Sequence, residues 1–334
     1  MSQPDVSVEP ERRALRLDLR DMRGLIAFAV IAIALVIIAQ ATTDTFLTER
    51  NFTNVMRQMV TNGLLSLGML MVILTGGIDL SVGCIVAFAA IAAVGLTFDQ
   101  LDRYTSFPVI PAMLLAVATG LVFGFINGIL VARFKLAPFV VTLATMTTIR
   151  GLTYVFSDVP LAPQPAIRDQ FRWLGATRIG AVPVAIILVA VAFLLGWVFL
   201  NRTPLGRSLI AIGGNRETVR LAGISVTRGI VVAYMICGGL AAVAGVILAS
   251  RTGNVQPSLG VAFELDAIAA CVIGGADLAG GKGSIQGTLA GVVILQLMNN
   301  LLSLWGVQDF WQQVFKGLII ILVILMQSQT RRRN

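Results

Sequence analysis

Residues 74–83 read LTGGIDLSVG and interrupt a long apolar part of the chain. No charged residue occurs in 58–78 or in 80–98, so the carboxylate of Asp79 stands alone between two runs of membrane-spanning length. A charged side chain at the bilayer centre costs roughly 2.5–3.5 kcal/mol on insertion scales. The paired glycines before Asp79 favour a break in the helix, and broken backbone at membrane depth is tolerated only inside protein or along a wet cavity. We therefore predict a broken span with a functional carboxylate.

The composition is that of an integral membrane protein. The 334 residues are 57% hydrophobic and 13% charged, with a mean hydropathy of +0.87, whereas soluble domains carry about 25% charged residues. The net charge of +8 comes from basic residues scattered in short loops, which fits orientation in a lipid bilayer and not nucleic-acid binding. The absence of histidine excludes imidazole proton relays and histidine metal sites.

The fold class that we predict is all-α, a polytopic membrane protein with about ten transmembrane helices, several of them short or discontinuous. A span needs about 20 apolar residues. The ten runs that meet this length approximately are 24–41, 55–78, 80–98, 108–132, 136–156, 180–200, 229–250, 261–276, 284–303 and 310–328.

The distribution of lysine and arginine predicts which loops face the cytosol. Cytosolic loops carry an excess of these residues, and ten crossings from a cytosolic N-terminus place most of them inside. The domain boundaries that follow are a cytosolic tail (1–23), one transmembrane domain (24–328) with an internal loop (201–228), and a cytosolic basic tail (329–334). Both termini are expected in the cytosol, and the other loops predicted inside are 132–135 and 277–283.

The eighth run, 261–276, is the weakest. Ten residues, 267–276, separate Asp266 from Asp277, and a helix of that length covers about half of the hydrocarbon core. We expect this span to be broken or partly re-entrant, with Glu264 and Asp266 near or within the membrane.

Two rows of glycine at four-residue spacing predict close helix contacts. They are Gly120, Gly124 and Gly128 in the fourth run, and Gly283, Gly287 and Gly291 in the ninth. Rows of this kind let helix backbones approach each other. Short, glycine-punctuated segments also occur where transporters build a site from discontinuous helices.

Polar residues inside the predicted spans are the candidates for a translocation pathway or gate. Serine, threonine and asparagine more often satisfy a backbone group or a neighbour, whereas carboxylates usually face a pathway or a partner. Arg57 and Arg150 are possible partners, although the sequence does not say which base pairs with which acid. The candidate pathway or gate residues are Asn62, Asp79, Ser81, Asn127, Glu264 and Asp266, with Thr75 and Thr142 as further intramembrane polar groups.

The loop 201–228 is the longest internal loop. Within it, Asn215 can cap a short helix that begins at Arg216 and ends at Gly223. One interpretation is an amphipathic segment on the membrane surface, held by its arginines. The other is a docking surface for a cytosolic partner.

No catalytic constellation or metal cluster is found in the sequence. Residues 275–284 read GADLAGGKGS, which resembles a phosphate loop but departs from the G-x-x-x-x-G-K-[ST] pattern at Ala276 and Gly283. We therefore expect a protein that is not an enzyme and that holds no cofactor itself.

Three stretches together resemble the membrane subunit of ATP-binding-cassette sugar importers, in the branched-chain amino acid/ribose permease family. They are ILTGGIDLSVG (73–83), GRSLIAIGGNRETVRLAGIS (206–225) and ELDAIAACVIGGADLAGGKGS (264–284), and their order and spacing extend the similarity over nearly the whole chain. Relatives often have a small Ala pair where this chain has Glu217-Thr218, and a hydroxyl residue where it has Asp277.

The resemblance implies a permease subunit in a bacterial plasma (inner) membrane that imports a monosaccharide such as ribose. Its implied partners are two cytosolic ATPase subunits that use ATP, an external sugar-binding protein, and a second permease copy, identical or related. The segment 206–225 would couple to the ATPase, and the coupling positions would be Gly213, Gly214, Asn215, Glu217, Arg220 and Gly223.

Two other functions stay open from the residues alone. An ion-coupled secondary transporter would bind its coupling ion at Asp79, Glu264 or Asp266 and would need no ATPase. A membrane-embedded enzyme would use residues 281–283 to bind phosphate. The size of the 201–228 loop favours the ATP-driven permease over the ion-coupled transporter.

Overall fold

The computed structural model describes residues 19–98, 107–180, 182–308, 310–318, 321 and 325, and most of them are helical. The predicted tail 329–334 and most of the predicted tail 1–23 lie outside these residues. Helix α1 begins at Leu19, five residues before the predicted start. The elements are α1 (Leu19–Thr42), α2 (Glu49–Leu74), α3 (Val82–Gly95), α4 (Val109–Ala132), α5 (Pro138–Phe156), η1 (Pro165–Ile167), α6 (Arg168–Ala176), β1 (Arg178–Ile179), β2 (Val182–Pro183), α7 (Val184–Arg202), α8 (Pro204–Gly214), α9 (Arg216–Leu221), α10 (Val226–Thr252), α11 (Phe263–Ile273) and α12 (Ile285–Leu304), and residues 310–318 are also helical.

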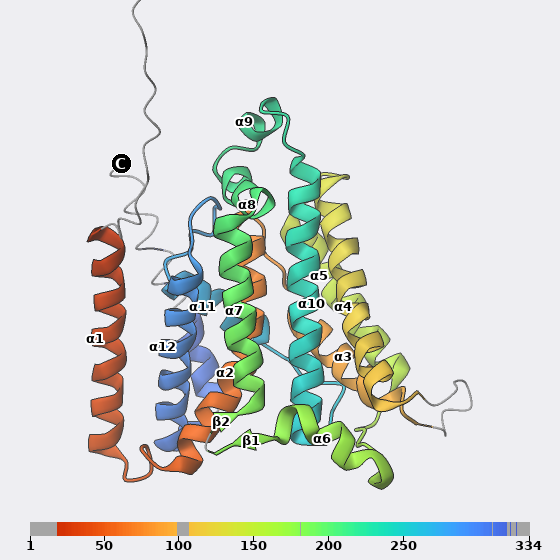
Figure 1. The fold of residues 1–334 in the computed structure, drawn as a ribbon, viewed down its shortest axis with the longest axis vertical. Helices are drawn as coiled ribbons and strands as arrows, with labels where there is room; N and C mark the ends of the chain where they lie inside the picture. Colours follow the sequence, from red (N-terminus) through yellow and green to blue (C-terminus); the bar gives the residue numbers. More distant parts are fainter. Residues whose placement is uncertain are drawn as a thin grey trace, which may run out of the picture.

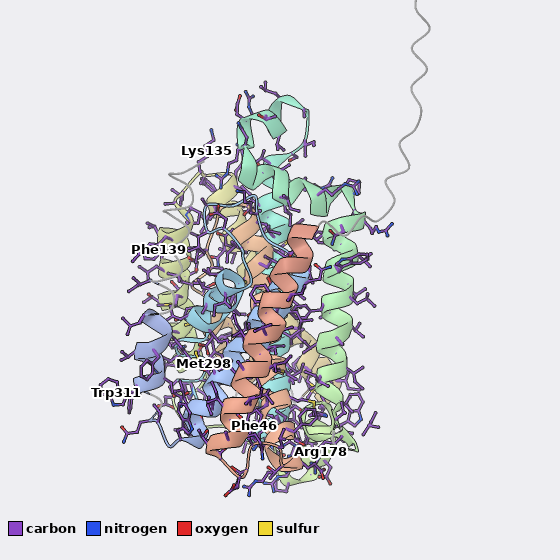
Figure 2. All side chains as sticks on the ribbon, turned by 90° about the vertical axis from the view of Figure 1, so that its left-hand side faces the viewer. Phe46, Lys135, Phe139, Arg178, Met298 and Trp311 are labelled. Carbon is purple, nitrogen blue, oxygen red and sulfur yellow. The ribbon has the colours of Figure 1, made fainter. Side chains whose placement is uncertain are left out.

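The helices form a bundle with two distinct ends (Figure 1). Helices α8 and α9 lie at one, which we call the α9 end, and the antiparallel β1–β2 hairpin lies with α6 at the other, the hairpin end. Lys135, in a loop predicted to be cytosolic, lies at the α9 end, whereas Arg178, which is outside the loops predicted to be cytosolic, lies at the hairpin end (Figure 2). These two residues thus lie at opposite ends of the bundle, and the side of the membrane that each end faces stays a prediction.

Six helices among the described residues are long and apolar enough to cross a membrane. They are α2, α4, α5, α7, α10 and α12, and each coincides with a predicted span. The remaining predicted spans also correspond to helices, but α3 and α11 have 14 and 11 residues and cannot span alone. The total of ten crossings stays a prediction.

The core is built around α2, α3 and α10, which are far more buried than the outer helices α4, α5 and α7. The most apolar window of α2 is 83% buried and that of α10 is 72% buried, against 22–28% for α4, α5 and α7. The outer helices expose leucine, isoleucine, valine and phenylalanine side chains, including Leu194 and Val155. Such faces suit contact with lipid tails, in which exposed apolar groups carry no penalty.

Two spans consist of a non-helical segment followed by a short helix. Residues 75–81 connect α2 to α3, and residues 253–262 connect α10 to α11. These two spans cross where Gly83, in the first turn of α3, contacts Gly260. The contact is so close that a Cβ at either glycine would lie 2.2 Å from the carbonyl oxygen of the other. The predicted break in the LTGGIDLSVG stretch is therefore confirmed, whereas the eighth run holds one continuous helix of 11 residues that follows a non-helical segment, and its partial crossing stays a prediction. Residues 75–81 are buried or half-buried throughout, as broken backbone at membrane depth requires, whereas the segment 253–262 is exposed at Asn254, Gln256, Ser258 and Val261.

The glycine row in α4 lets this helix pack directly against α10. A Cβ at Gly124 would lie 2.3 Å from the carbonyl oxygen of Tyr234, and a Cβ at Gly120 would lie 2.3 Å from that of Gly238. In the second row, Gly287 and Gly291 bring α12 against α11 in the same way. The close contacts predicted from the spacing are confirmed.

Gly124→Ala should separate α4 from α10, because the new methyl group has no space beside the Tyr234 carbonyl. We expect a loss of about 1–3 kcal/mol in stability, the usual cost of overpacking, seen as a lower thermal unfolding midpoint in detergent. Gly151→Ala is the matched control, since a Cβ there meets nothing within 4 Å. An equal midpoint for the two variants would contradict this account of the helix contact.

Candidate functional site

Asp79 is fully buried in the segment between α2 and α3, where it organises the start of α3. Its Oδ1 accepts hydrogen bonds from the backbone N–H of Ser81 at 2.9 Å and from the Ser81 hydroxyl at 2.6 Å. The Ser81 hydroxyl oxygen in turn accepts from Nδ2 of Asn127 in α4, at 3.0 Å. Three of the predicted pathway or gate residues thus form one buried network, which we call the Asp79 network.

Two acceptor atoms of the Asp79 network have no hydrogen-bond partner among the described residues. They are Oδ2 of Asp79 and Oδ1 of Asn127. A buried acceptor without a donor costs about 1–3 kcal/mol, so this network is not at its most stable arrangement. A cluster of this kind is suited to a segment that changes its contacts between two states.

The network lies inside the bundle and near the α9 end. Asn127 is five residues before the end of α4, and Thr142 is four residues after the start of α5, which places both about 6–8 Å from those helix ends. The Thr142 hydroxyl donates to the carbonyl oxygen of Ile78 at 3.2 Å. The hydroxyl of Tyr234 in α10 approaches the same oxygen at 3.5 Å. Tyr234 was not among the predicted site residues, because no local sequence pattern ties it to Asp79.

Three chain segments cross tightly just above this network, at the end of α2. The backbone N–H of Gly281 donates to the carbonyl oxygen of Leu74 at 3.0 Å, and Nη2 of Arg216 donates to that of Thr75 at 3.1 Å. Gly213 fits between these segments, since a Cβ there would lie 2.0 Å from the Leu74 carbonyl oxygen. The crossing therefore connects α8 and α9 directly to the break that holds Asp79.

Helix α9 confirms the capped helix predicted from the sequence. Oδ1 of Asn215 accepts from the backbone N–H groups of Glu217 at 3.0 Å and Thr218 at 3.1 Å. On its surface, Nε of Arg220 donates to Glu217 at 3.0 Å, and this hydrogen bond lowers the pKa of the Glu217 carboxyl. Because both side chains are exposed, this ion pair orients the surface and adds little to stability.

The end of α9 presents exposed apolar side chains. Leu221 is 75% exposed and Ile224 is 45% exposed. Of the six predicted coupling positions, Gly213 packs inside the crossing, and the other five are exposed at the α9 end. The preceding helix α8 was not predicted. Thr203 followed by Pro204 is nevertheless a helix-start signal, and in the structure the Thr203 hydroxyl accepts a hydrogen bond from the backbone N–H of Gly206 at 3.0 Å.

Glu264 lies in the first turn of α11, close to the start of α3. A Cβ at Gly83 would lie 2.6 Å from its Oε2. Nη1 of Arg150 in α5 donates to the carbonyl oxygens of Pro257 and Leu259, the latter at 2.9 Å, and holds the extended segment before α11 in place. Two helix N-termini and a half-buried carboxylate thus meet here, an arrangement suited to binding a polar solute.

Asp266 pairs with a base that the sequence analysis did not consider as its partner. Nζ of Lys316, in the helix 310–318, lies 2.8 Å from Oδ1 and 3.1 Å from Oδ2 of Asp266. The two side chains are 10–15% exposed. The suggested partners, Arg57 and Arg150, are therefore not those of Asp266.

Asn62 belongs to a different set of contacts, between α2 and α12. Its Nδ2 donates to Gln296 at 3.1 Å, and Gln296 donates to Gln58. Further along the same helices, Asn51 and Asn300 exchange two hydrogen bonds of 3.0 and 2.8 Å. Side-chain hydrogen bonds of this kind join helices in a membrane. Asn62 is thus separate from the Asp79 network.

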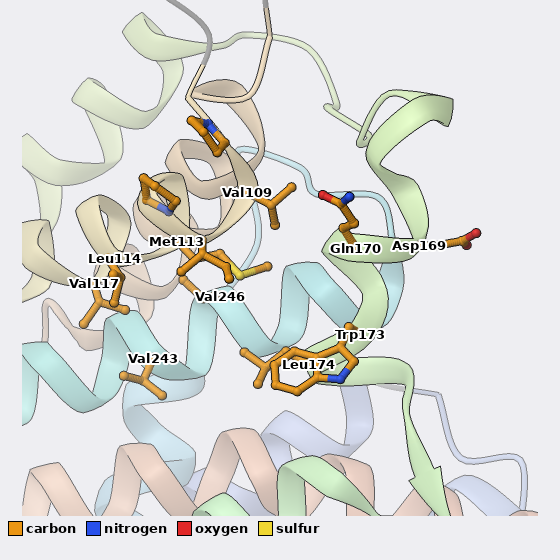
Figure 3. A pocket seen from close by; sticks show the side chains of 13 residues that line it. Val109, Met113, Leu114, Val117, Asp169, Gln170, Trp173, Leu174, Val243 and Val246 are labelled. Atoms are coloured by element: carbon orange, nitrogen blue, oxygen red, sulfur yellow. The ribbon is translucent and has the colours of Figure 1, made fainter.

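A cavity of about 910 Å³ opens at the hairpin end between α4, α6 and α10 (Figure 3). Its walls are apolar side chains such as Met113 and Val246, and Asp169 is the one charged residue among the described residues that line it. Trp173 forms part of the wall and is 63% exposed. With so few polar groups, this cavity does not suit a polar solute.

Comparison with known proteins gives a match over most of the chain. Residues 51–324 match the family described as the permease component of branched-chain amino acid transport systems. The ribose import permease protein RbsC of Bacillus subtilis is 44% identical over 88% of this chain and 90% of its own length. The RbsC protein of Escherichia coli K12 is 36% identical over 93% of this chain and 94% of its own length. The galactose/methyl galactoside import permease protein MglC of Haemophilus influenzae is also 36% identical, over 92% of this chain and 94% of its own length. No solved structure gives a significant match.

Lys316→Gln should destabilise the protein by roughly 2–3 kcal/mol, because it leaves Asp266 charged and mostly buried without its partner. This is somewhat less than the roughly 3–5 kcal/mol typical of a fully buried pair. The double variant Asp266→Asn with Lys316→Gln should recover part of the loss, since it removes both charges. Thermal unfolding of the full chain in detergent measures both. A double variant as unstable as the sum of the two single variants would show that the ion pair has no coupling energy.

Proposed function

Because the chain belongs to the family of permease components of branched-chain amino acid transport systems, we propose that it is the membrane subunit of an ATP-binding-cassette importer for a monosaccharide such as ribose or a related sugar. The relatives named for ribose and galactose import, which it matches along 88–93% of its length, support the sugar class. It is an integral protein of a bacterial inner membrane. Its partners are an ATPase and a substrate-binding protein, and it is not itself an enzyme.

The observation that carries this proposal is the direct connection between α9 and the Asp79 network. The Arg216–Thr75 hydrogen bond joins the exposed helix to the break between α2 and α3, and the Gly281–Leu74 hydrogen bond fixes the segment that packs against Gly213 to the end of α2. A cytosolic ATPase that pushes on α9 would therefore move the segment that holds Asp79. We assign α9 to the cytosolic side, with its exposed Leu221 as a docking contact, and both chain termini to the same side.

The proposed pathway runs along the side of the bundle formed by α5 and the helix 310–318. Phe139 of α5 and Trp311 lie on this same side (Figure 2). Although α5 is apolar enough to span, it exposes the hydroxyl groups of Thr147 and Thr148. These hydroxyls donate to the carbonyl oxygens of Leu143 and Ala144 within α5 and keep acceptor capacity toward a wet cavity, and a second permease copy facing this side would enclose the pathway.

In this arrangement the predicted residues have different functions. Glu264, beside the meeting point of α3 and α11, is the proposed solute contact, because a neutral sugar is bound through hydroxyl hydrogen bonds. Asp79, Ser81 and Asn127 form the proposed inner gate. Asp266 holds the helix 310–318 through Lys316, and Asn62 holds α2 to α12. Two ATPase subunits would complete an assembly with two permease copies.

Reconstitution tests the function. We expect vesicles that contain the permease, its ATPase and its external binding protein to accumulate labelled ribose or a related monosaccharide when ATP is supplied on the ATPase side. Vesicles without the ATPase but with a proton or sodium gradient should not accumulate it. Uptake driven by the gradient alone would identify an ion-coupled transporter and would overturn the proposal.

Asp79→Asn should reduce ATP-driven uptake while leaving membrane insertion intact. The amide keeps an acceptor for the Ser81 hydrogen bonds but removes the charge that the gate would use. We expect a loss of about tenfold or more in uptake rate, the scale of one charged hydrogen bond. Asp44→Asn, the same exchange at an exposed carboxylate outside the network, is the matched control. Normal uptake by Asp79→Asn would remove Asp79 from the gate.

Asn215→Pro should uncouple or detach the ATPase, because it removes the side chain that caps α9. Asn215→Asp is the matched control, since its carboxylate can accept the same two hydrogen bonds. The measurement is co-purification of the ATPase with the permease, together with uptake. Full association and full uptake with the proline variant would remove α9 from the ATPase contact.

A further inference from the structure

A second cavity at the hairpin end is lined by positive charge. It has a volume of about 650 Å³ and lies between the first turns of α2 and the β1–β2 hairpin. Its charged lining residues are three arginines and one carboxylate: Arg50, Arg57, Arg178 and Glu49. The polar side chains of Thr48, Thr53 and Asn54 complete the wall. We call this cavity the arginine pocket.

The arginines of this pocket lack anionic partners within the described part of the chain. The two ion pairs formed there are Arg220–Glu217 and Lys316–Asp266, and neither includes a residue of the pocket. Nε of Arg57 is buried and has no hydrogen-bond partner there. The guanidinium of Arg251, at the end of α10, adds a further repulsive charge to Arg57. Several guanidinium groups that line one polar cavity without forming an ion pair favour an anion inside it.

The depth of Arg57 indicates which kind of anion reaches the pocket. Arg57 is eight residues after Glu49, so it lies about 12 Å along α2 from the helix start. The uncharged apolar run of α2 follows directly after it. The guanidinium therefore lies where the water-exposed hairpin end meets the hydrocarbon region, which is the level of lipid headgroups. An acidic side chain of a protein docked on the hairpin end would have to reach about two helical turns inward.

The surroundings of the pocket also fit a lipid. Phe52 is 54% exposed, and Ile179, next to Arg178 in the hairpin, is 65% exposed. These side chains offer apolar contacts beside the charged groups. A phosphate group has enough oxygen atoms to accept from several guanidinium groups at once, and arginine is suited to such contacts.

We propose that the arginine pocket binds a phosphate group, carried by the headgroup of a phospholipid in the leaflet at the hairpin end or present as free phosphate. The level of Arg57 favours the lipid as the source. This site lies at the opposite end from α9, and it does not depend on transport. Its function is to neutralise the arginines and to fix the depth of α2 in the membrane.

The test uses the full chain in complex with its ATPase partner, delipidated in detergent and titrated with dioleoylphosphatidylglycerol. Native mass spectrometry counts the bound lipid. We expect Arg57→Gln and Arg178→Gln each to weaken phosphate-dependent lipid binding by about tenfold, as expected for loss of a hydrogen bond to a charged group. Arg168→Gln is the matched control, because it removes an exposed arginine at the same end that is not part of the pocket. Should Arg57→Gln fail to fold, the exposed hairpin residue Arg178 carries the test.

Three further arms distinguish the sources. A monogalactosyl diacylglycerol has similar acyl chains without phosphate, and it should bind equally to the wild type and the variants. Inorganic phosphate that binds as strongly as the lipid, with the same sensitivity to both substitutions, would identify free phosphate as the source. Lipid binding that is equal in all variants would overturn the proposal. The proposal would also be overturned if the substitutions weakened binding of the external binding protein and left lipid binding unchanged. That result would identify the pocket as a docking site for this protein. None of these assays requires sugar or ATP, so their outcome is separate from that of the uptake experiment.

Discussion

Backbone carbonyl groups that lie at membrane depth outside helices constrain the whole structure. Water cannot satisfy them there, so protein groups must. In the segment 75–81, a hydroxyl from Thr142 and a guanidinium from Arg216 donate to carbonyl oxygens. In the segment 253–262, Arg150 donates to two. Two of these donors come from α5 and the third from α9, so the two breaks tie α5, α9 and the central helices into one unit.

This arrangement links a surface helix to the interior through few contacts. The crossing of Leu74, Gly213 and Gly281 is formed by backbone atoms at very short range, and it transmits displacement because it leaves no space to absorb it. The Asp79 network directly below has two unpartnered acceptors, so a shift of α3 or α4 can improve its hydrogen bonding. A rigid connection thus ends at a group with more than one acceptable arrangement, which is what a gate requires.

The polar residues of the membrane region fall into two classes according to their surroundings. One class joins helices, as Asn62 and Gln296 do between α2 and α12, and these side chains are satisfied by one another. The other class has unmet hydrogen-bonding capacity, as at Asp79 and in the arginine pocket around Arg57. Residue type does not separate the classes, because asparagine occurs in both. Hydrogen-bond partners separate them.

The sequence by itself determined what depends on neighbouring residues. Apolar runs set the helices, paired glycines set the break before Asp79, and Asn215 set the start of α9 through bonds to residues two and three positions away. The tertiary structure decided what depends on distant pairs. Lys316 reaches Asp266 across 50 residues, and Arg216 reaches Thr75 across 141. Local hydrogen bonds follow from chain geometry, whereas the partner of a buried charge depends on which helices pack together, and no local pattern carries that information.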